Sequence, residues 1–97
     1  MVEARVESRE AVVAALRSLV DANTIYRVKG FAALPGTPMR LVVQGVGQRF
    51  DTYFDRRWTA AEAVSETSRF VLIGEDLDQP RLQQALVAAL ANAPVQA

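Results

Sequence analysis

The fold is decided by the stretch TIYRVKGFAALPGTPMRLVVQG, residues 24–45. Its first half carries apolar side chains with no helical period, and the Pro-Gly-Thr-Pro of residues 35–38 is a strong turn signal. The apolar pattern resumes at residues 39–45. The stretch therefore predicts a hairpin of two strands, residues 24–34 and residues 39–45.

Three more strands are predicted on either side of this hairpin. Side chains alternate along residues 49–55, which favours a third hairpin-linked strand, and residues 2–7 alternate between apolar and charged side chains. Residues 69–73 are apolar at four successive positions, a pattern typical of a strand that is covered on both faces or central in its sheet. Gly74 is expected to end that strand.

Two helices are predicted, one in each half of the chain. Ser8 can cap the first, whose apolar residues recur at helical spacing as far as about Asn23. Asp78 is the expected cap of the second, which has one apolar stripe along residues 82–93. Residues 59–68, TAAEAVSETS, lack a strand pattern and have too short a helical one, so they are predicted to form a surface loop.

The element order is therefore β-α-β-β-β-β-α in a single domain, residues 1–97. With 51% apolar and 23% charged residues, the composition is that of an ordinary globular protein. This element order, with short connections, is satisfied by an α+β fold. In it a mainly antiparallel sheet of four to five strands carries both helices on one face.

Composition excludes several classes of function. Eleven basic residues balance eleven acidic ones, so no strong field favours nucleic acid or an anionic membrane. The chain has no histidine and no cysteine, which removes imidazole and thiolate metal ligands and the commonest general base. No Gly-x-x-x-x-Gly-Lys-Ser/Thr phosphate loop or Gly-x-Ser-x-Gly elbow is present, so the chain is not expected to be an enzyme. The N-terminal MVEARVESRE does not resemble a signal peptide, which predicts a cytoplasmic protein.

Carboxylates are the remaining candidates for acid-base chemistry or for a weak magnesium or calcium site. They form one group at residues 75–78 and a pair, Asp51 and Asp55. The first group is better explained by a solvated turn and a helix cap, because Asp78 precedes the second helix. Its spacing matches no EF-hand loop.

The strand at residues 26–31 offers a more specific candidate site. Alternation places Arg27, Lys29 and Phe31 on one face. One interpretation is that this face, with Gln44 and Arg49 from the following strands, receives an anionic group or a partner surface. The other is that Arg27 and Lys29 are solvated and pair with the aspartates at positions 51 and 55.

Trp58, the single tryptophan, follows the third hairpin-linked strand. It is a candidate anchor for a binding partner or a lid over the edge of the core. The core role is the more frequent one for a lone tryptophan in a domain of this size.

Four segments together resemble a known family. They are YRVKGF at residues 26–31, LVVQGVG at 41–47, DRRW at 55–58, and LIG at 72–74 followed by LD at 77–78. In this order and spacing, they resemble the C-terminal domain of CobW-like proteins over nearly the whole chain.

The resemblance implies a parent protein, a GTP-dependent metallochaperone, whose N-terminal GTPase domain holds GTP, magnesium and zinc or cobalt. Such a parent would deliver cobalt for cobalamin biosynthesis or handle zinc. None of the family's catalytic or metal-binding motifs occurs in this sequence, so no cofactor is expected in this chain. The expected partners are the GTPase domain and a client metalloprotein. The alternative hypothesis is a small module that binds an anion or a metal ion by itself.

Overall fold

In a computed structural model, residues 1–63 and 67–91 of the 97-residue chain are described. The helices and strands follow one another in the order β1 (Val2–Ala4), α1 (Arg9–Ala22), β2 (Thr24–Ala32), β3 (Met39–Val46), β4 (Arg49–Arg57), α2 (Ala60–Ala63), β5 (Ser68–Glu75) and α3 (Gln79–Ala91). Apart from the short helix α2, this is the predicted order. None of the helices described is long and apolar enough to cross a membrane.

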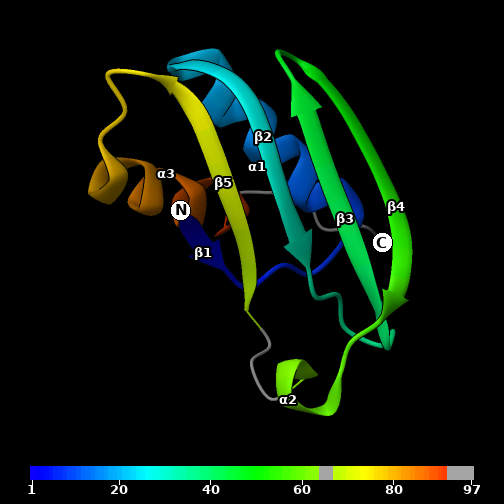
Figure 1. The fold of residues 1–97 in the computed structure, drawn as a ribbon. Helices are drawn as coiled ribbons and strands as arrows, with labels where there is room; N and C mark the ends of the chain where they lie inside the picture. The colour runs from blue at the N-terminus through cyan, green and yellow to red at the C-terminus, as the bar shows by residue number, and fades with distance from the viewer. Residues whose placement is uncertain (64–66, 92–97) are drawn as a thin grey trace.

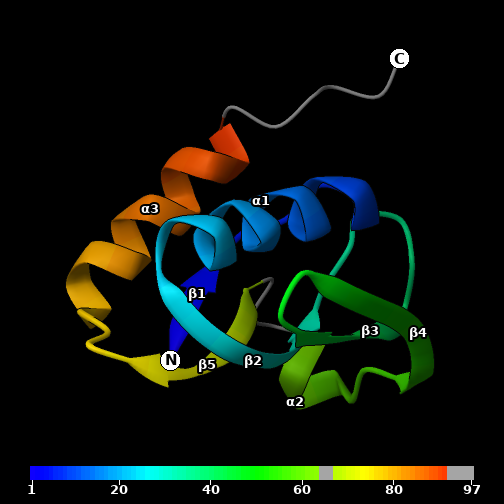
Figure 2. The same ribbon diagram turned by 90° about the horizontal axis from the view of Figure 1, so that it is seen from above.

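The five strands form one antiparallel sheet in the order β1-β5-β2-β3-β4. Strand β2 lies in the centre, where Val28 is opposite Leu72 of β5 on one side and Gly45 of β3 on the other. Helices α1 and α3 lie together against one face of this sheet (Figures 1 and 2). The predicted α+β class, with two helices on one face, is confirmed.

The core lies between this helical layer and the sheet. Ser8 accepts a hydrogen bond from the backbone N–H of Ala11 at 3.1 Å and so caps α1, as predicted. Helix α1 then buries its residues at positions 11, 12, 15, 16 and 19, and α3 buries Leu82 and Leu86. Phe70 of β5 is fully buried beneath these helices. The predicted cap of α3 also forms, because Asp78 accepts from the N–H of Arg81 at 3.2 Å.

All five strands differ from their predicted lengths: β2 ends two residues earlier than predicted, β3 one residue later and β4 two residues later, and β1 and β5 also differ. Strand β1 ends at Ala4 rather than at residue 7, because its neighbour β5 begins at Ser68 and offers no partner beyond the Ala4–Ser68 pair. Strand β5 continues through Gly74 to Glu75, since Gly74 is paired with Ile25. The expectation that Gly74 ends the strand is therefore wrong.

The surface-loop prediction for residues 59–68 is wrong at both ends of the segment. Residues 60–63 form helix α2, which a capping box stabilises: Thr59 N–H donates to Glu62 at 2.9 Å, and Glu62 N–H donates to the Thr59 hydroxyl at 3.2 Å. Ser68 belongs to β5, and its buried hydroxyl accepts from Ala33 N–H at 2.9 Å. Residues 64–66, and Ala93 of the predicted helical stripe, lie outside the described residues.

The described residues place no helical layer on the second face of the sheet. Strand β5 is paired along both edges, but only one of its faces is covered, so Val71 and Ile73 remain 49% and 55% exposed. Figure 2 shows α1 and α3 on the opposite side of the sheet, and the only other described helix, α2, lies beyond the ends of the strands in Figure 1. The four successive apolar positions of β5 therefore do not indicate burial on both faces.

Candidate functional site

The candidate site is the face of the sheet opposite α1 and α3, which we call the open face. Register defines its rows, because side chains on directly paired residues of neighbouring strands point to the same side. Its members include Glu3 of β1, Arg69, Val71 and Ile73 of β5, Arg27, Lys29 and Phe31 of β2, Val42, Gln44 and Val46 of β3, and Arg49, Asp51 and Tyr53 of β4.

Each of the two cations of β2 is paired with one residue on β5 and one on β3. Lys29 is opposite Val71 on β5 and Gln44 on β3, and Arg27 is opposite Ile73 and Val46. Both cations are exposed. A groove of about 600 Å³ runs over this part of the open face, lined by residues of β2 and β5 and by Met1. Strand pairing thus places Arg27, Lys29, Phe31, Gln44 and Arg49 on the face on which the sequence predicts them.

The acidic residues near this face do not neutralise the two cations. Asp55 is held by Arg40, whose Nε donates to Oδ1 at 3.0 Å and whose Nη2 donates to Oδ2. This hydrogen bonding from Arg40 lowers the pKa of Asp55. Among the residues that the structure describes, Arg27 and Lys29 form no ion pair, with Asp51 or with any other acid. In the described structure, Arg27 and Lys29 therefore do not form the ion pairs with Asp51 and Asp55 that the alternative interpretation predicts.

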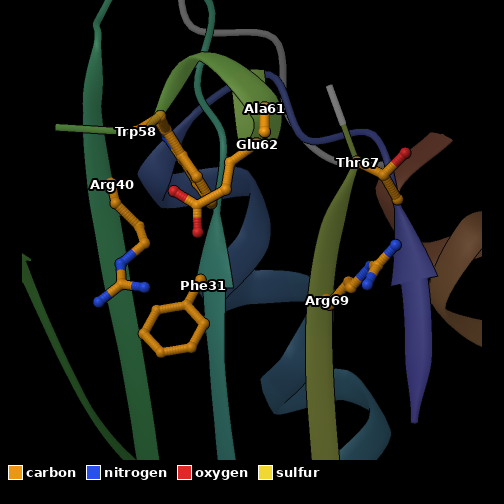
Figure 3. Close-up of a pocket in the computed structure, with 7 residues that line it drawn as sticks. All are labelled: Phe31, Arg40, Trp58, Ala61, Glu62, Thr67 and Arg69. Atoms are coloured by element: carbon orange, nitrogen blue, oxygen red, sulfur yellow. The ribbon is translucent and has the colours of Figure 1, made fainter. Parts of the chain in front are cut away.

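Phe31 joins the open face to a second cavity at the α2 end of the sheet. The guanidinium of Arg40 lies 3.9 Å from the centre of the Phe31 ring, an arrangement that favours a cation–π interaction. The cavity beside them has a volume of about 430 Å³ and is shown in Figure 3. It is lined by Phe31, Arg40, Trp58, Ala61, Glu62, Thr67 and Arg69.

Trp58 belongs to this cavity and not to the groove beside Lys29. It is half-buried, and its backbone N–H donates to the carbonyl of Pro38 at 2.9 Å. Its indole N–H is buried and has no hydrogen-bond partner among the described residues. Trp58 thus lines the cavity with a hydrogen-bond donor that has no partner among the described residues, a position compatible with both roles considered from the sequence.

Sequence reasoning missed the aliphatic part of the open face, Val71 and Ile73, and also Arg69 beside them. The signal was present in the apolar run of residues 70–73, but a run of this kind does not tell which face is covered. Only the position of both helices on the same side of the sheet decides that Phe70 is buried and Val71 is exposed.

The carboxylate group at residues 75–78 has a structural role in the described part of the chain. Asp78 caps α3, and Asp76 has a left-handed backbone with φ of 55° in the turn that precedes it. The described residues contain no group of three or more acidic side chains arranged to hold a metal ion.

Glu62 should titrate far below an ordinary glutamate. Two hydrogen bonds from Arg56, at 2.9 and 3.0 Å, and one from Thr59 N–H lower its pKa to about 2. Because the folded pKa lies below the unfolded one, Glu62 stabilises the α2 turn at any pH above about 4.5, and this contribution is lost as the pH falls through about 2. NMR titration of the Glu62 carboxyl carbon should give a midpoint near 2. A midpoint at the ordinary glutamate value would contradict the hydrogen bonds.

Comparison with known proteins places this geometry in a family. A family model described as the cobalamin synthesis protein cobW C-terminal domain matches residues 3–90. A zinc chaperone CobW from Pseudomonas aeruginosa is 56% identical over 81 residues, which are 84% of this chain and 21% of that protein. A zinc chaperone CobW from Sinorhizobium is 40% identical over 79 residues, covering 80% of this chain and 22% of that protein. The chain thus spans about a fifth of the length of these curated relatives.

Solved structures agree with this assignment. The Zn(II)-bound YjiA GTPase from E. coli superposes with a TM-score of 0.66 at 26% identity, over 97% of this chain and 28% of that one. A Zn(II)-bound triple mutant of YjiA GTPase gives a TM-score of 0.68 at 28% identity, over 92% of this chain and 28% of the mutant. The predicted family resemblance is confirmed: the chain belongs to the CobW C-terminal domain family.

Proposed function

We propose that the chain is the non-catalytic interaction and regulatory domain of a CobW-like, GTP-dependent metallochaperone of the cytoplasm. In this proposal the parent protein delivers zinc or cobalt, in the latter case for cobalamin biosynthesis. GTP, magnesium and the transported metal would be held by an N-terminal GTPase domain. The open face would contact that domain or a client metalloprotein, so that nucleotide state and metal loading are coupled through the interface.

The observation that carries the proposal is the chemistry of the open face. Val71 and Ile73 expose half of their surface next to two cations without ion-pair partners among the described residues. A sheet normally buries its apolar side chains against another layer, and in the described part of the chain only one of the two faces has such a layer. An apolar surface with charged neighbours is typical of a surface that another protein covers.

Catalysis is assigned to the parent's other domain because this domain offers too few reactive groups. It has no histidine or cysteine, and Asp55, one member of its candidate carboxylate pair, is occupied by Arg40. Asp51 is exposed, whereas a general acid or base needs a cleft that shifts its pKa toward neutrality. The described side chains therefore favour binding over chemistry.

Charge reversal in the full-length parent protein tests the proposal. With Arg27→Glu and Lys29→Glu together, metal transfer to the client should fall about tenfold or more, because a complementary charge pair is replaced by repulsion. GTP turnover should also lose its response to metal. Arg81→Glu, a reversal of an exposed cation on α3, is the matched control and should change neither. Unchanged transfer and turnover in the double variant would contradict the proposed role of the open face.

A second candidate function is supported by the same two cations. Without acidic partners, Arg27 and Lys29 are suited to an anion such as phosphate or the phosphate groups of GTP. Calorimetry of the 97-residue chain with phosphate, GTP, zinc and cobalt separates this alternative from protein docking. Heat of binding for phosphate or GTP that disappears in the double variant would support it, and no binding of any of the four would remove it.

A further inference from the structure

We infer that the open face binds an amphipathic helix on which two carboxylates, one helical turn apart, project among apolar side chains. The inference rests on the proposed function and specifies the chemistry of the partner that this function requires. It depends on the spacing of Arg27 and Lys29 and on the apolar residues that flank them.

The spacing of the two cations matches the repeat of a helix. Arg27 and Lys29 lie two residues apart on one strand, which separates their Cα atoms by about 6.6 to 6.8 Å. Residues i and i+4 of an α-helix advance by about 6 Å along the axis and share one face. Two acidic side chains at i and i+4 can therefore each reach one of the two cations.

Apolar side chains flank the cations on both neighbouring strands. Ile73 and Val71 lie on β5, and Val46, which is 61% exposed, lies on β3. A helix that covered these side chains would also take Arg27 and Lys29 out of water. Burying a cation is costly unless an opposite charge and hydrogen bonds replace its hydration. The partner must therefore supply carboxylates as well as apolar surface.

A helix fits this location better than a strand or a second copy of the chain. An added strand would pair at an edge, β1 or β4, and would leave the open face uncovered. Two copies meeting through their open faces would bring their unpaired cations together, which is repulsive. The opposite face of the same sheet already shows how helices cover it, through α1 and α3 (Figure 2).

Designed helical peptides test the inference directly on the 97-residue chain. The first peptide carries leucines on one face with glutamates at i and i+4 among them. A second has lysines in place of the two glutamates, and a third moves one glutamate to i+2, on another side of the helix. Fluorescence anisotropy should show the first peptide binding about tenfold or more tightly than either of the others. With Arg27→Glu and Lys29→Glu in the chain, the preference should change to the lysine peptide, whereas Arg81→Glu should leave it unchanged.

Two results would overturn the inference. One is equal affinity for all three peptides. The other is a glutamate peptide that perturbs the methyl groups of Val87, exposed on α3, instead of those of Val71 and Ile73. Either result could occur while charge reversal still abolishes metal transfer in the full-length parent. In that case the proposed docking role would stand, and only the acidic helix would be wrong.

Discussion

Replacing Phe70 with alanine should lower the free energy of unfolding by about 3 to 5 kcal/mol. Phe70 has no exposed surface and belongs to the core between the sheet and the two long helices. Its ring also lies against Gly30 of β2, where an added Cβ would come within 2.5 Å of the Phe70 Cδ1 atom. The surrounding strands and helices cannot collapse fully into the space that the ring leaves, so a cavity term adds to the lost burial.

Val71 provides a matched control for this prediction on the same strand. Its side chain points to the open face and is half exposed, so Val71→Ala should cost about 0.5 kcal/mol or less. Urea denaturation of the two variants and of the unmodified chain, followed by circular dichroism, measures the difference. Equal losses for the two variants would contradict the assignment of one covered and one open face.

Gly74→Ala should cost about 3 kcal/mol, at the upper end of the range for overpacked sites. A Cβ at this position would lie 1.9 Å from the carbonyl oxygen of Thr24 and 2.9 Å from the Cα of Ile25. Both atoms belong to the backbone of β2, so no side chain can rotate away to relieve the contact. The strands would have to separate where they are paired, next to the irregularity between Ile25 and Arg27.

Gly47 is the control, because it needs glycine for a different reason. It has φ of 58° in the turn between β3 and β4, and no atom lies within 4 Å of an added Cβ. Asparagine tolerates this backbone conformation, so Gly47→Asn should cost less than about 1 kcal/mol. A Gly74→Ala variant as stable as Gly47→Asn would show that β2 and β5 are not packed as closely as described.

The sequence was sufficient for the two long helices and for most of the sheet, because those elements have local signals. Ser8 and Asp78 are caps that act within one turn, and the turn residues between β2 and β3 separate two apolar segments. The end of β1 was not predictable in this way, because it depends on where β5 begins, about 60 residues away. Helix α2 had a local signal that sequence reasoning missed, the capping box formed by Thr59 and Glu62.

The candidate site was predictable only in part, for a similar reason. Alternation along β2 is sufficient to place Arg27 and Lys29 on one face. The pairing of β2 with β5 is a long-range contact, and it brings Val71 and Ile73 beside these cations. Pairing of these cations with Asp55 also depended on a long-range contact. Arg40, on β3 opposite the end of β4, is hydrogen-bonded to the Asp55 carboxylate instead.

The most direct test is methyl NMR of the chain while the GTPase domain proposed for the parent protein, expressed separately, is added. We predict that the methyl resonances of Val71 and Ile73 shift or broaden as the GTPase domain is added. Val87 on α3, with a similar exposed fraction of 51%, should stay unchanged. A perturbation of Val87 that leaves Val71 and Ile73 unaffected would contradict the claim that the open face is the docking surface.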